Sequence, residues 1–237
     1  ASPLRDVYKR QQLAMLDRYA RGFFTALFRP LVRTLARAGA TPNLVTVLGS
    51  VGAAVSAVAL YSWGQLFWGT VAITLFIFSD MIDGQLARYL DQQAEAGHGQ
   101  ARSTADRALG NFLDSSLDRL VDFAIFGTLA FWWFTGGGRP MFGTAALVLM
   151  AAGGLVSYVR AKAEALGFDA SVGFVERSER LVVVLVLTGF TGLGLNAWWW
   201  FGGVVAVCVG SVVTIGQRIA KVVSQARAGH EPAQTRR

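Results

Sequence analysis

Two pairs of aspartates mark a place in the sequence where chemistry could occur. Asp80 and Asp83 stand three residues apart after the apolar run WGTVAITLFIF, and Asp114 and Asp118 stand four apart where the next apolar segment begins. At these spacings each pair shares one face of a helix. Carboxylates that meet near a membrane must share protons or bind cations. Magnesium, manganese and calcium prefer such oxygen ligands, and two divalent ions can neutralise a diphosphate during displacement at phosphorus. The spacing therefore predicts a divalent-metal site.

Simpler interpretations exist for each pair alone. The motif Asp-x-x-Asp-Gly also fits a loop-type calcium site or a solvated helix end, and the carboxylates could be ion-paired with Arg88 and Arg119. Two pairs on consecutive segments, accompanied by small residues at Gly84, Ala87 and Gly110, favour a metal site with room for a ligand.

The composition predicts an integral membrane protein. Of the 237 residues, 53% are hydrophobic and only 16% are charged. The net charge of +7 does not indicate a nucleic-acid partner, because the basic residues lie between the apolar runs and at the termini. The single cysteine, Cys208, lies in an apolar stretch and is interpreted as a small core residue.

Six apolar runs are long enough to be membrane-spanning helices, since a span needs about 20 residues. They cover residues 43–62, 65–88, 111–134, 141–161, 179–195 and 197–217. Arg139 is the only basic residue on one side of these spans, and the other 21 of the 22 lysines and arginines lie on or near the opposite side. Positive charge accumulates on the cytoplasmic side. We therefore expect a multi-pass protein of the cell membrane with both termini and the loops 89–110 and 162–178 in the cytoplasm.

The parts of the chain outside these spans differ in character. Residues 1–11 carry no periodic signal and are interpreted as a disordered or cloning-derived tail, and residues 221–237 as a cytoplasmic tail. Residues 12–40 place apolar side chains at helical spacing opposite a row of arginines, which predicts an amphipathic helix at the membrane interface. A cleaved signal peptide is the weaker alternative for that segment. The remaining residues, 41–220, form the predicted six-helix domain.

The aspartates belong to a longer pattern, D-x-x-D-G-x-x-A-R followed by G-x-x-x-D-x-x-x-D, which ends at Asp118. This pattern resembles the signature of the CDP-alcohol phosphotransferases, six-helix membrane enzymes that transfer a phospholipid group from a CDP-linked donor to an alcohol. Every fixed position is present. One departure is the 21 residues between Arg88 and Gly110, where the family usually has eight. We interpret the extra residues as an enlarged cytoplasmic loop.

The resemblance implies roles for particular residues. Two magnesium ions, or manganese, would be held by Asp80, Asp83, Asp114 and Asp118. Asp118 would also be the catalytic base that takes the proton of the acceptor hydroxyl. The CDP-linked donor would be bound by Pro42, Asn43, Thr46, Asp83, Gly84, Ala87, Arg88 and Gly110. A homodimer is likewise implied by the family.

The acceptor is predicted from three arginines on three helices. Arg160, Arg180 and Arg218 all lie on the cytoplasmic side and could converge on one phosphate. For any one of them alone, an anchor at the lipid headgroups is the preferred interpretation, and this is also how we interpret Lys162 and Arg177. The sequence around the three arginines is similar to that of the bacterial branch of the family that uses inositol phosphate and makes phosphatidylinositol phosphate.

The sequence therefore predicts a membrane phosphatidyltransferase that uses CDP-diacylglycerol and a phosphorylated polyol, and releases CMP. Inositol phosphate is the first choice of acceptor. Glycerol 3-phosphate is the alternative, which would make the protein a phosphatidylglycerophosphate synthase. A cation transporter is the alternative from another class, although it would spread its carboxylates through the membrane thickness. An aspartate-rich membrane prenyltransferase would need more spans and other motif spacings.

Overall fold

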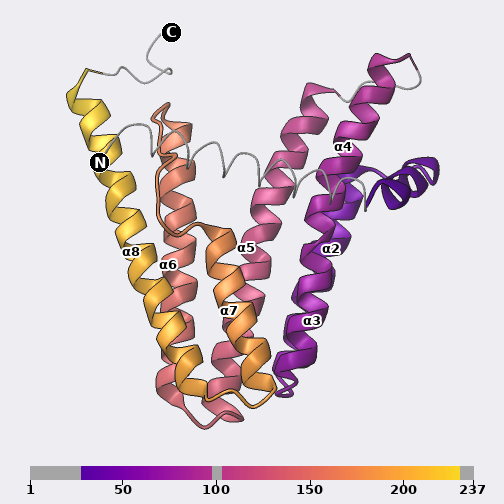
Figure 1. Ribbon diagram of the computed structural model, residues 1–237. Helices are drawn as coiled ribbons and strands as arrows, with labels where there is room; N and C mark the ends of the chain where they lie inside the picture. Colours follow the sequence, from indigo (N-terminus) through magenta and orange to yellow (C-terminus); the bar gives the residue numbers. More distant parts are fainter. Residues whose placement is uncertain (1–27, 98–102, 230–237) are drawn as a thin grey trace, which may run out of the picture. The chain divides into compact units, whose positions relative to one another are not determined.

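The computed structural model describes residues 28–97 and 103–229, and these residues form helices and no strands. A helical segment at residues 28–37 is followed by α2 (Pro42–Ser56), which continues into a π-helical turn (Ala57–Tyr61). The remaining helices are α3 (Leu66–Ile77), α4 (Ser79–Glu95), α5 (Thr104–Thr135), α6 (Pro140–Ala165), α7 (Arg177–Gly192) and α8 (Ala197–Arg227) (Figure 1). The prediction of an all-α protein is confirmed.

Each of the six predicted spans is helical in the structure, but one is divided. The run predicted at 65–88 forms two helices, because α3 ends at Ile77 and α4 begins at Ser79. Of the predicted helix at 12–40, only residues 28–37 are described as helix. The tail at 1–11 lies outside the described residues, and so does the end of the predicted tail at 221–237.

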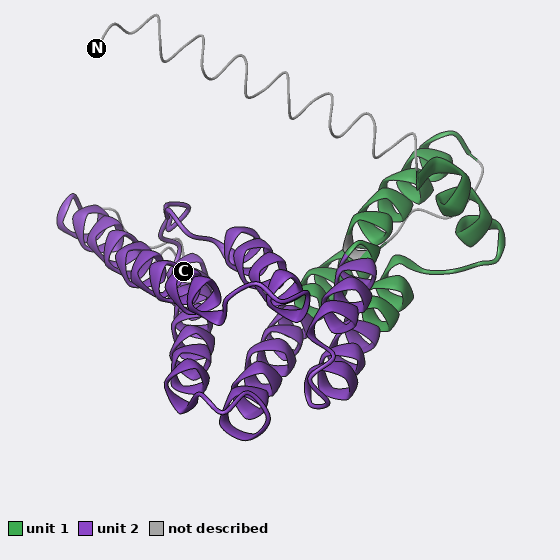
Figure 2. Cartoon of the chain, turned by 60° about the horizontal axis from the view of Figure 1, so that its bottom comes forward, with its two compact units in different colours: residues 1–49, 78–114 green, residues 50–77, 115–237 purple. Residues whose placement is uncertain are grey.

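The chain divides into two compact units (Figure 2). Unit 1 comprises Ala1–Gly49 and Phe78–Asp114, and unit 2 comprises Ser50–Ile77 and Ser115–Arg237. Unit 1 therefore contains the start of α2, all of α4 and the first part of α5. Unit 2 contains α3, the rest of α5, and α6 to α8.

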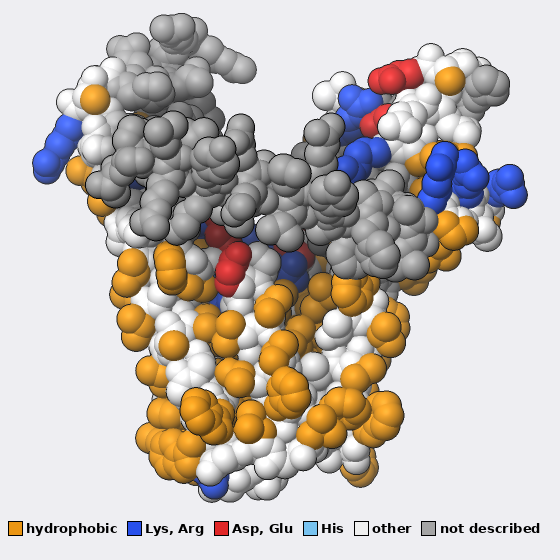
Figure 3. Space-filling view, in the orientation of Figure 1, with side chains coloured by type: hydrophobic (Ala, Val, Ile, Leu, Met, Phe, Trp, Pro, Cys, Tyr) orange, Lys and Arg blue, Asp and Glu red, His pale blue; other side chains and the backbone are white. Residues whose placement is uncertain are grey.

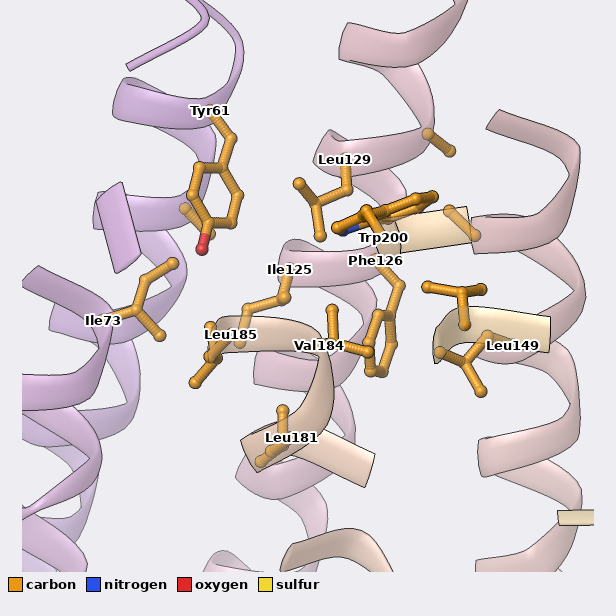
Figure 4. Packing of buried hydrophobic residues seen from close by; sticks show 14 of the residues in the cluster. Tyr61, Ile73, Ile125, Phe126, Leu129, Leu149, Leu181, Val184, Leu185 and Trp200 are labelled. Atoms are coloured by element: carbon orange, nitrogen blue, oxygen red, sulfur yellow. The ribbon is translucent and has the colours of Figure 1, made fainter. Parts of the chain in front are cut away.

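The hydrophobic core of unit 2 is built from the inward faces of its helices. In this unit α6 packs against α8, and α7 packs against both α3 and α8. Phe126, Leu149 and Val184 lie within this core (Figure 4). The indole Nε1 of the buried Trp200 donates a 2.9 Å hydrogen bond to the Thr188 hydroxyl, which satisfies a polar group that burial would otherwise leave unpaired. The core thus fixes α5 to α8 beside one another.

Large apolar side chains also cover the outward faces of the helices (Figure 3). Trp68 on α3 and Val212 on α8 are each 62% exposed. Four helical stretches are long and apolar enough to cross a membrane: Pro42–Tyr61, Leu66–Glu95, Pro140–Ala165 and Ala197–Arg227. Apolar surface of this kind is stable in lipid, and the structure is therefore that of a multi-pass membrane protein.

The other two predicted spans, at 111–134 and 179–195, are not among these four stretches. Helix α7 has only 16 residues. Helix α5 has 32, but its first half carries the acidic and basic residues that face the candidate sites.

Candidate active site

Unit 1 contains a pocket of about 290 Å³ between the first turn of α2, α4 and α5. It is lined by Pro42, Asn43, Thr46, Asp83, Gly84, Ala87, Gly110, Asn111 and Asp114. We call it the donor pocket. Every residue predicted to bind the CDP-linked donor lines it except Arg88. Asn111 was missed by the sequence analysis, although its spacing of three residues from Asp114 places it on the same helix face.

Local structure explains how this pocket stays open. Pro42 occupies the first position of α2, where its missing N–H costs no hydrogen bond. The Thr46 hydroxyl donates a hydrogen bond to Oδ2 of Asp83, which ties α4 to α2 within unit 1. A Cβ on Gly84 would meet only Nη2 of Arg88, at 3.9 Å, among the described atoms. Arg88 itself turns back along α4, and its Nε donates to the Gly84 carbonyl at 3.0 Å.

The donor pocket brings together two of the four predicted metal ligands. Asp83 and Asp114 both line it, whereas Asp118 lines a pocket of unit 2. Asp80 lies on α4, but its side chain is outside the described part of the structure. Among the described side chains no group of three or more Asp, Glu, His or Cys residues is placed to hold a metal. The donors present are carboxylate, hydroxyl and amide oxygens, which is the set that magnesium and manganese take.

Unit 2 contains a second pocket, of about 320 Å³, which we call the arginine pocket. It is lined by Ser115, Asp118, Arg119, Val156, Ser157, Arg160, Ala161, Glu164, Glu176, Arg177 and Arg218. Two of the three arginines predicted to bind the acceptor phosphate, Arg160 and Arg218, are therefore present. The third, Arg180, does not line the pocket because its side chain is completely buried.

Arg160 and Arg218, the two predicted arginines that line the pocket, have different hydrogen-bond partners. Arg218 donates to the carbonyl oxygens of Val156 (2.7 Å) and Val172 (2.8 Å) and to Oε1 of Glu176 (3.2 Å). It therefore links α8 to α6 and to the loop after α6, as far as the N-cap residue of α7. Arg160 pairs with the Glu164 carboxylate on its own helix at 2.8 Å.

Arg177 was interpreted as a headgroup anchor, and the structure shows a different arrangement. Its Nη1 lies 2.7 Å from Oδ1 of Asp118, and its Nε donates to Oδ1 of Asp122 at 3.1 Å. Nη2 of Arg180 donates to the other oxygen of Asp122 at 3.0 Å. Because Asp118 and Asp122 are four residues apart on α5, both reach the first turn of α7. The anchor interpretation of Arg177 is wrong, since its charge is paired inside the protein.

The loop between α6 and α7 is fastened to α8 by Asp169. Its carboxylate accepts a hydrogen bond from Nζ of Lys221 at 2.5 Å and another from the backbone N–H of Ser171 at 2.8 Å. The bond from Lys221 is the largest cause that holds the pKa of this carboxyl well below its usual range, followed by the bonds from Ser171. The loop brings Glu176 to the arginine pocket, so its attachment helps to shape that pocket.

Comparison with known proteins agrees with this helical architecture. A profile of the CDP-alcohol phosphatidyltransferases matches residues 39–208, which is well over half of the chain. The chain belongs to the CDP-alcohol phosphatidyltransferase family, and it is thus a membrane enzyme of the phosphotransferase class.

Several relatives are similar to this chain over most of its length. A phosphatidylinositol phosphate synthase of Streptomyces avermitilis is 41% identical over 221 residues, covering 88% of this chain and 83% of the relative. One of Mycolicibacterium smegmatis is 36% identical, covering 85% and 86%. The crystal structure of the Mycobacterium tuberculosis phosphatidylinositol phosphate synthase with CDP-DAG bound has a TM-score of 0.71 at 32% identity, covering 81% of this chain and 92% of that one. The same enzyme in complex with manganese and citrate gives a TM-score of 0.70 at 33% identity, covering 81% and 87%.

Proposed function

We propose that this enzyme transfers the phosphatidyl group of CDP-diacylglycerol to inositol phosphate, forming phosphatidylinositol phosphate and releasing CMP. The observation that carries the proposal is the arginine pocket, where guanidinium groups suited to a phosphate lie beside the carboxylate of Asp118. The relatives named as phosphatidylinositol phosphate synthases support inositol phosphate as the acceptor.

The donor pocket would take the CDP end of the lipid. Small residues at Gly84, Ala87 and Gly110 leave space for the nucleotide, and Asn43 and Asn111 offer hydrogen-bonding groups. Pro42, Thr46 and Asp83 complete this wall of the pocket, and we keep Arg88 as a residue that faces the donor phosphates.

Two divalent ions, magnesium or manganese, would be held by Asp80, Asp83, Asp114 and Asp118. A relative of known structure is described in complex with manganese. Bound ions would neutralise the diphosphate of the donor. Thr46 supports this arrangement, because its hydroxyl fixes the orientation of the Asp83 carboxylate.

The arginine pocket would bind the acceptor, and one of its carboxylates would act as the base. The phosphate of inositol phosphate would be held by Arg160 and Arg218, which line the pocket, and Arg180 would contribute positive charge from its buried position beside Asp122. Asp118 would take the proton of the attacking hydroxyl. The hydroxyl oxygen then forms a bond to the lipid-side phosphorus, and the bond from that phosphorus to the CMP oxygen breaks. The proton stays on Asp118 and CMP leaves as a phosphate monoester.

We also propose the membrane arrangement that this chemistry needs. All six predicted spans, including the short α7 and the charged α5, would cross the bilayer, with both termini and both pockets on the cytoplasmic side. The excess of basic residues on that side supports this orientation. Residues 12–40 would lie along the interface, residues 41–220 would form the catalytic domain, and the enzyme would act as a homodimer.

Removal of the proposed base tests the function. Asp118→Asn keeps the size of the side chain but cannot accept the proton, so CMP release should fall by about 10²-fold to 10⁴-fold. Asp106→Asn is the matched control, because Asp106 lies on the same helix, lines neither pocket, and accepts hydrogen bonds from the backbone N–H and the hydroxyl of Ser103. CMP release by the purified variants in lipid micelles would be followed with time. Near wild-type release by Asp118→Asn would refute the assignment.

A further inference from the structure

An open groove lies on unit 2 between the loop after α6 and the second half of α8. It has a volume of about 610 Å³. Ser171, Val172, Gly173 and Phe174 line it from the loop, and Gln217, Ala220 and Lys221 line it from α8. We call it the loop groove. Its described lining residues belong to neither the donor pocket nor the arginine pocket, so the proposed reaction does not account for it.

Phe174 is presented outward by a backbone that is fixed. The backbone N–H groups of Phe174 and Val175 both donate to the hydroxyl of Thr214, at 3.1 Å and 3.0 Å. Thr214 and Val175 are buried, whereas Phe174 is 79% exposed. A Cβ on Gly173 would lie 2.5 Å from Cγ2 of Thr214, so glycine is needed for the loop to come this close to α8. The exposure of Phe174 is therefore built into the way the loop packs.

The loop is fastened on both sides of Phe174. Before it, the backbone N–H of Asp169 donates to Oε1 of Gln225 at 3.0 Å, and Nε2 of Gln225 donates to the Asp169 carbonyl at 2.7 Å. After it, Glu176 is the N-cap residue of α7 and accepts a hydrogen bond from Arg218 at 3.2 Å. A phenylalanine held in water forfeits the free energy that burial of its ring would supply. Since these bonds keep the ring from folding back onto the protein, we expect an apolar environment outside the protein to cover it.

The position of the groove along α8 indicates which environment this is. Helix α8 is long and apolar enough to cross a membrane, and it carries no charged residue from 197 to 217. Lys221 is the first charged residue beyond the buried Arg218. Exposed apolar side chains continue there, at Ile219 and Val223. The groove thus lies where the lipid-facing surface of α8 changes from apolar to charged. Aromatic rings favour this level of a membrane, and a lysine stem can lie along apolar surface with its ammonium toward water.

We propose that the loop groove is a lipid-docking surface, in which the Phe174 ring inserts among the acyl chains and the glycerol and ester groups of a phospholipid lie against Ser171 and Gln217. In the orientation proposed above, this lipid belongs to the cytoplasmic leaflet. Docking holds the loop at the membrane surface rather than free in the cytoplasm. Lys221 is already paired with Asp169 at 2.5 Å, so the groove offers little net charge to a lipid headgroup. Docking should therefore not require an anionic lipid.

A spin label at position 174 tests the docking. Cys208 is the only cysteine of the chain, so Cys208→Ala removes the competing thiol and Phe174→Cys carries the label. The labelled protein would be placed in nanodiscs of phosphatidylcholine. The accessibility of the label to oxygen, which concentrates in lipid, would be compared with its accessibility to a water-soluble nickel chelate. The two controls are labels at Val212→Cys, on the exposed apolar surface of α8, and at Asp106→Cys, in the exposed first turn of α5.

The label at position 174 should favour oxygen over nickel, as the label at Val212→Cys does, whereas the label at Asp106→Cys should favour nickel. The preference should be the same when phosphatidylglycerol is added to the nanodiscs. A label at position 174 that favours nickel would overturn the proposal. A label shielded from both reagents would overturn it too, because a second copy of the chain or another part of the protein would then cover the groove. A preference for oxygen only with phosphatidylglycerol would show an electrostatic contact and contradict docking through the Phe174 ring.

Phe174→Ser measures what the native ring contributes. If the ring lies in lipid, the melting temperature in nanodiscs should fall by roughly 3–12 °C, and Phe174→Trp should restore it. If the ring lies in water, serine costs nothing, so an unchanged or higher melting temperature would count against docking. Neither measurement involves a substrate, so both are independent of CMP release and of the proposed function.

Discussion

Gly84→Ala should raise the thermal stability of the protein and raise its KM for CDP-diacylglycerol. Gly84 lies inside α4 with a helical backbone, and a Cβ there would come no closer than 3.9 Å to a described side chain, at Nη2 of Arg88. The fold can therefore accept the methyl group. Alanine favours a helix interior over glycine by about 1 kcal/mol, which corresponds to a rise in melting temperature of about 2–4 °C for a chain of this size.

The same methyl group enters the donor pocket, which Gly84 lines. Overfilling a site built to fit its ligand costs about 1–3 kcal/mol, so the KM for CDP-diacylglycerol should rise roughly 5-fold to 150-fold. The KM for inositol phosphate should not change, because no residue of the arginine pocket is altered. Stability and donor affinity are thus expected to move in opposite directions.

Gly202→Ala is the matched control. Gly202 lies inside α8, outside both pockets, and a Cβ there meets no atom of the described residues within 4 Å. It should give a similar gain in stability with normal kinetics. The assay measures CMP release while the donor concentration is varied at saturating acceptor, and melting temperature is measured on the same samples. Equal donor KM values for Gly84→Ala and Gly202→Ala would refute the assignment of the donor pocket.

Three further predictions concern stability. In Gly192→Ala, the new Cβ would clash with the backbone nitrogen of Phe67. The melting temperature should therefore fall below that of the wild type. An unchanged melting temperature would mean that α7 and α3 pack less tightly than described. Trp200→Phe leaves the buried Thr188 hydroxyl without its donor. The free energy of unfolding, measured with denaturant, should fall by about 1–3 kcal/mol. An unchanged free energy of unfolding would contradict a stabilising role of this hydrogen bond. The depressed pKa of Asp169 stabilises the folded protein above its unfolded value of 3.8 and less so as the pH falls below that value. The melting temperature of the wild type should therefore fall more steeply below pH 4 than that of Asp169→Asn. If the two proteins showed the same dependence of melting temperature on pH, the hydrogen bond between Asp169 and Lys221 would not stabilise the fold.

The positions of the helices could be predicted from the sequence, because they depend on the local pattern of apolar and polar residues. Each of the long apolar runs marked in the sequence is helical in the structure, because burial and lipid exposure both demand continuous hydrophobic faces. The spacing of the aspartates predicted one site formed by Asp80, Asp83, Asp114 and Asp118. In the structure Asp83 and Asp114 line the donor pocket, whereas Asp118 lines the arginine pocket. The break at Phe78 was missed, because an apolar residue gives no signal of a helix end.

The arginines were harder to predict, because their roles depend on partners far along the chain. Arg177 and Arg180 bind Asp122, which lies 55 and 58 residues earlier. In the sequence they resemble any basic residues at a membrane boundary. Only the packing of α7 against its neighbours shows that Arg180 is buried and that Arg177 reaches Asp118.

The central claim is tested most directly by the product of the purified wild-type enzyme. The protein would be incubated with CDP-diacylglycerol, magnesium and one acceptor at a time: inositol phosphate, glycerol 3-phosphate or unphosphorylated inositol. CMP would be quantified and the lipid product identified by mass spectrometry. We predict CMP release and phosphatidylinositol phosphate with inositol phosphate alone. Phosphatidylglycerophosphate as the main product, or equal rates with unphosphorylated inositol, would contradict the account.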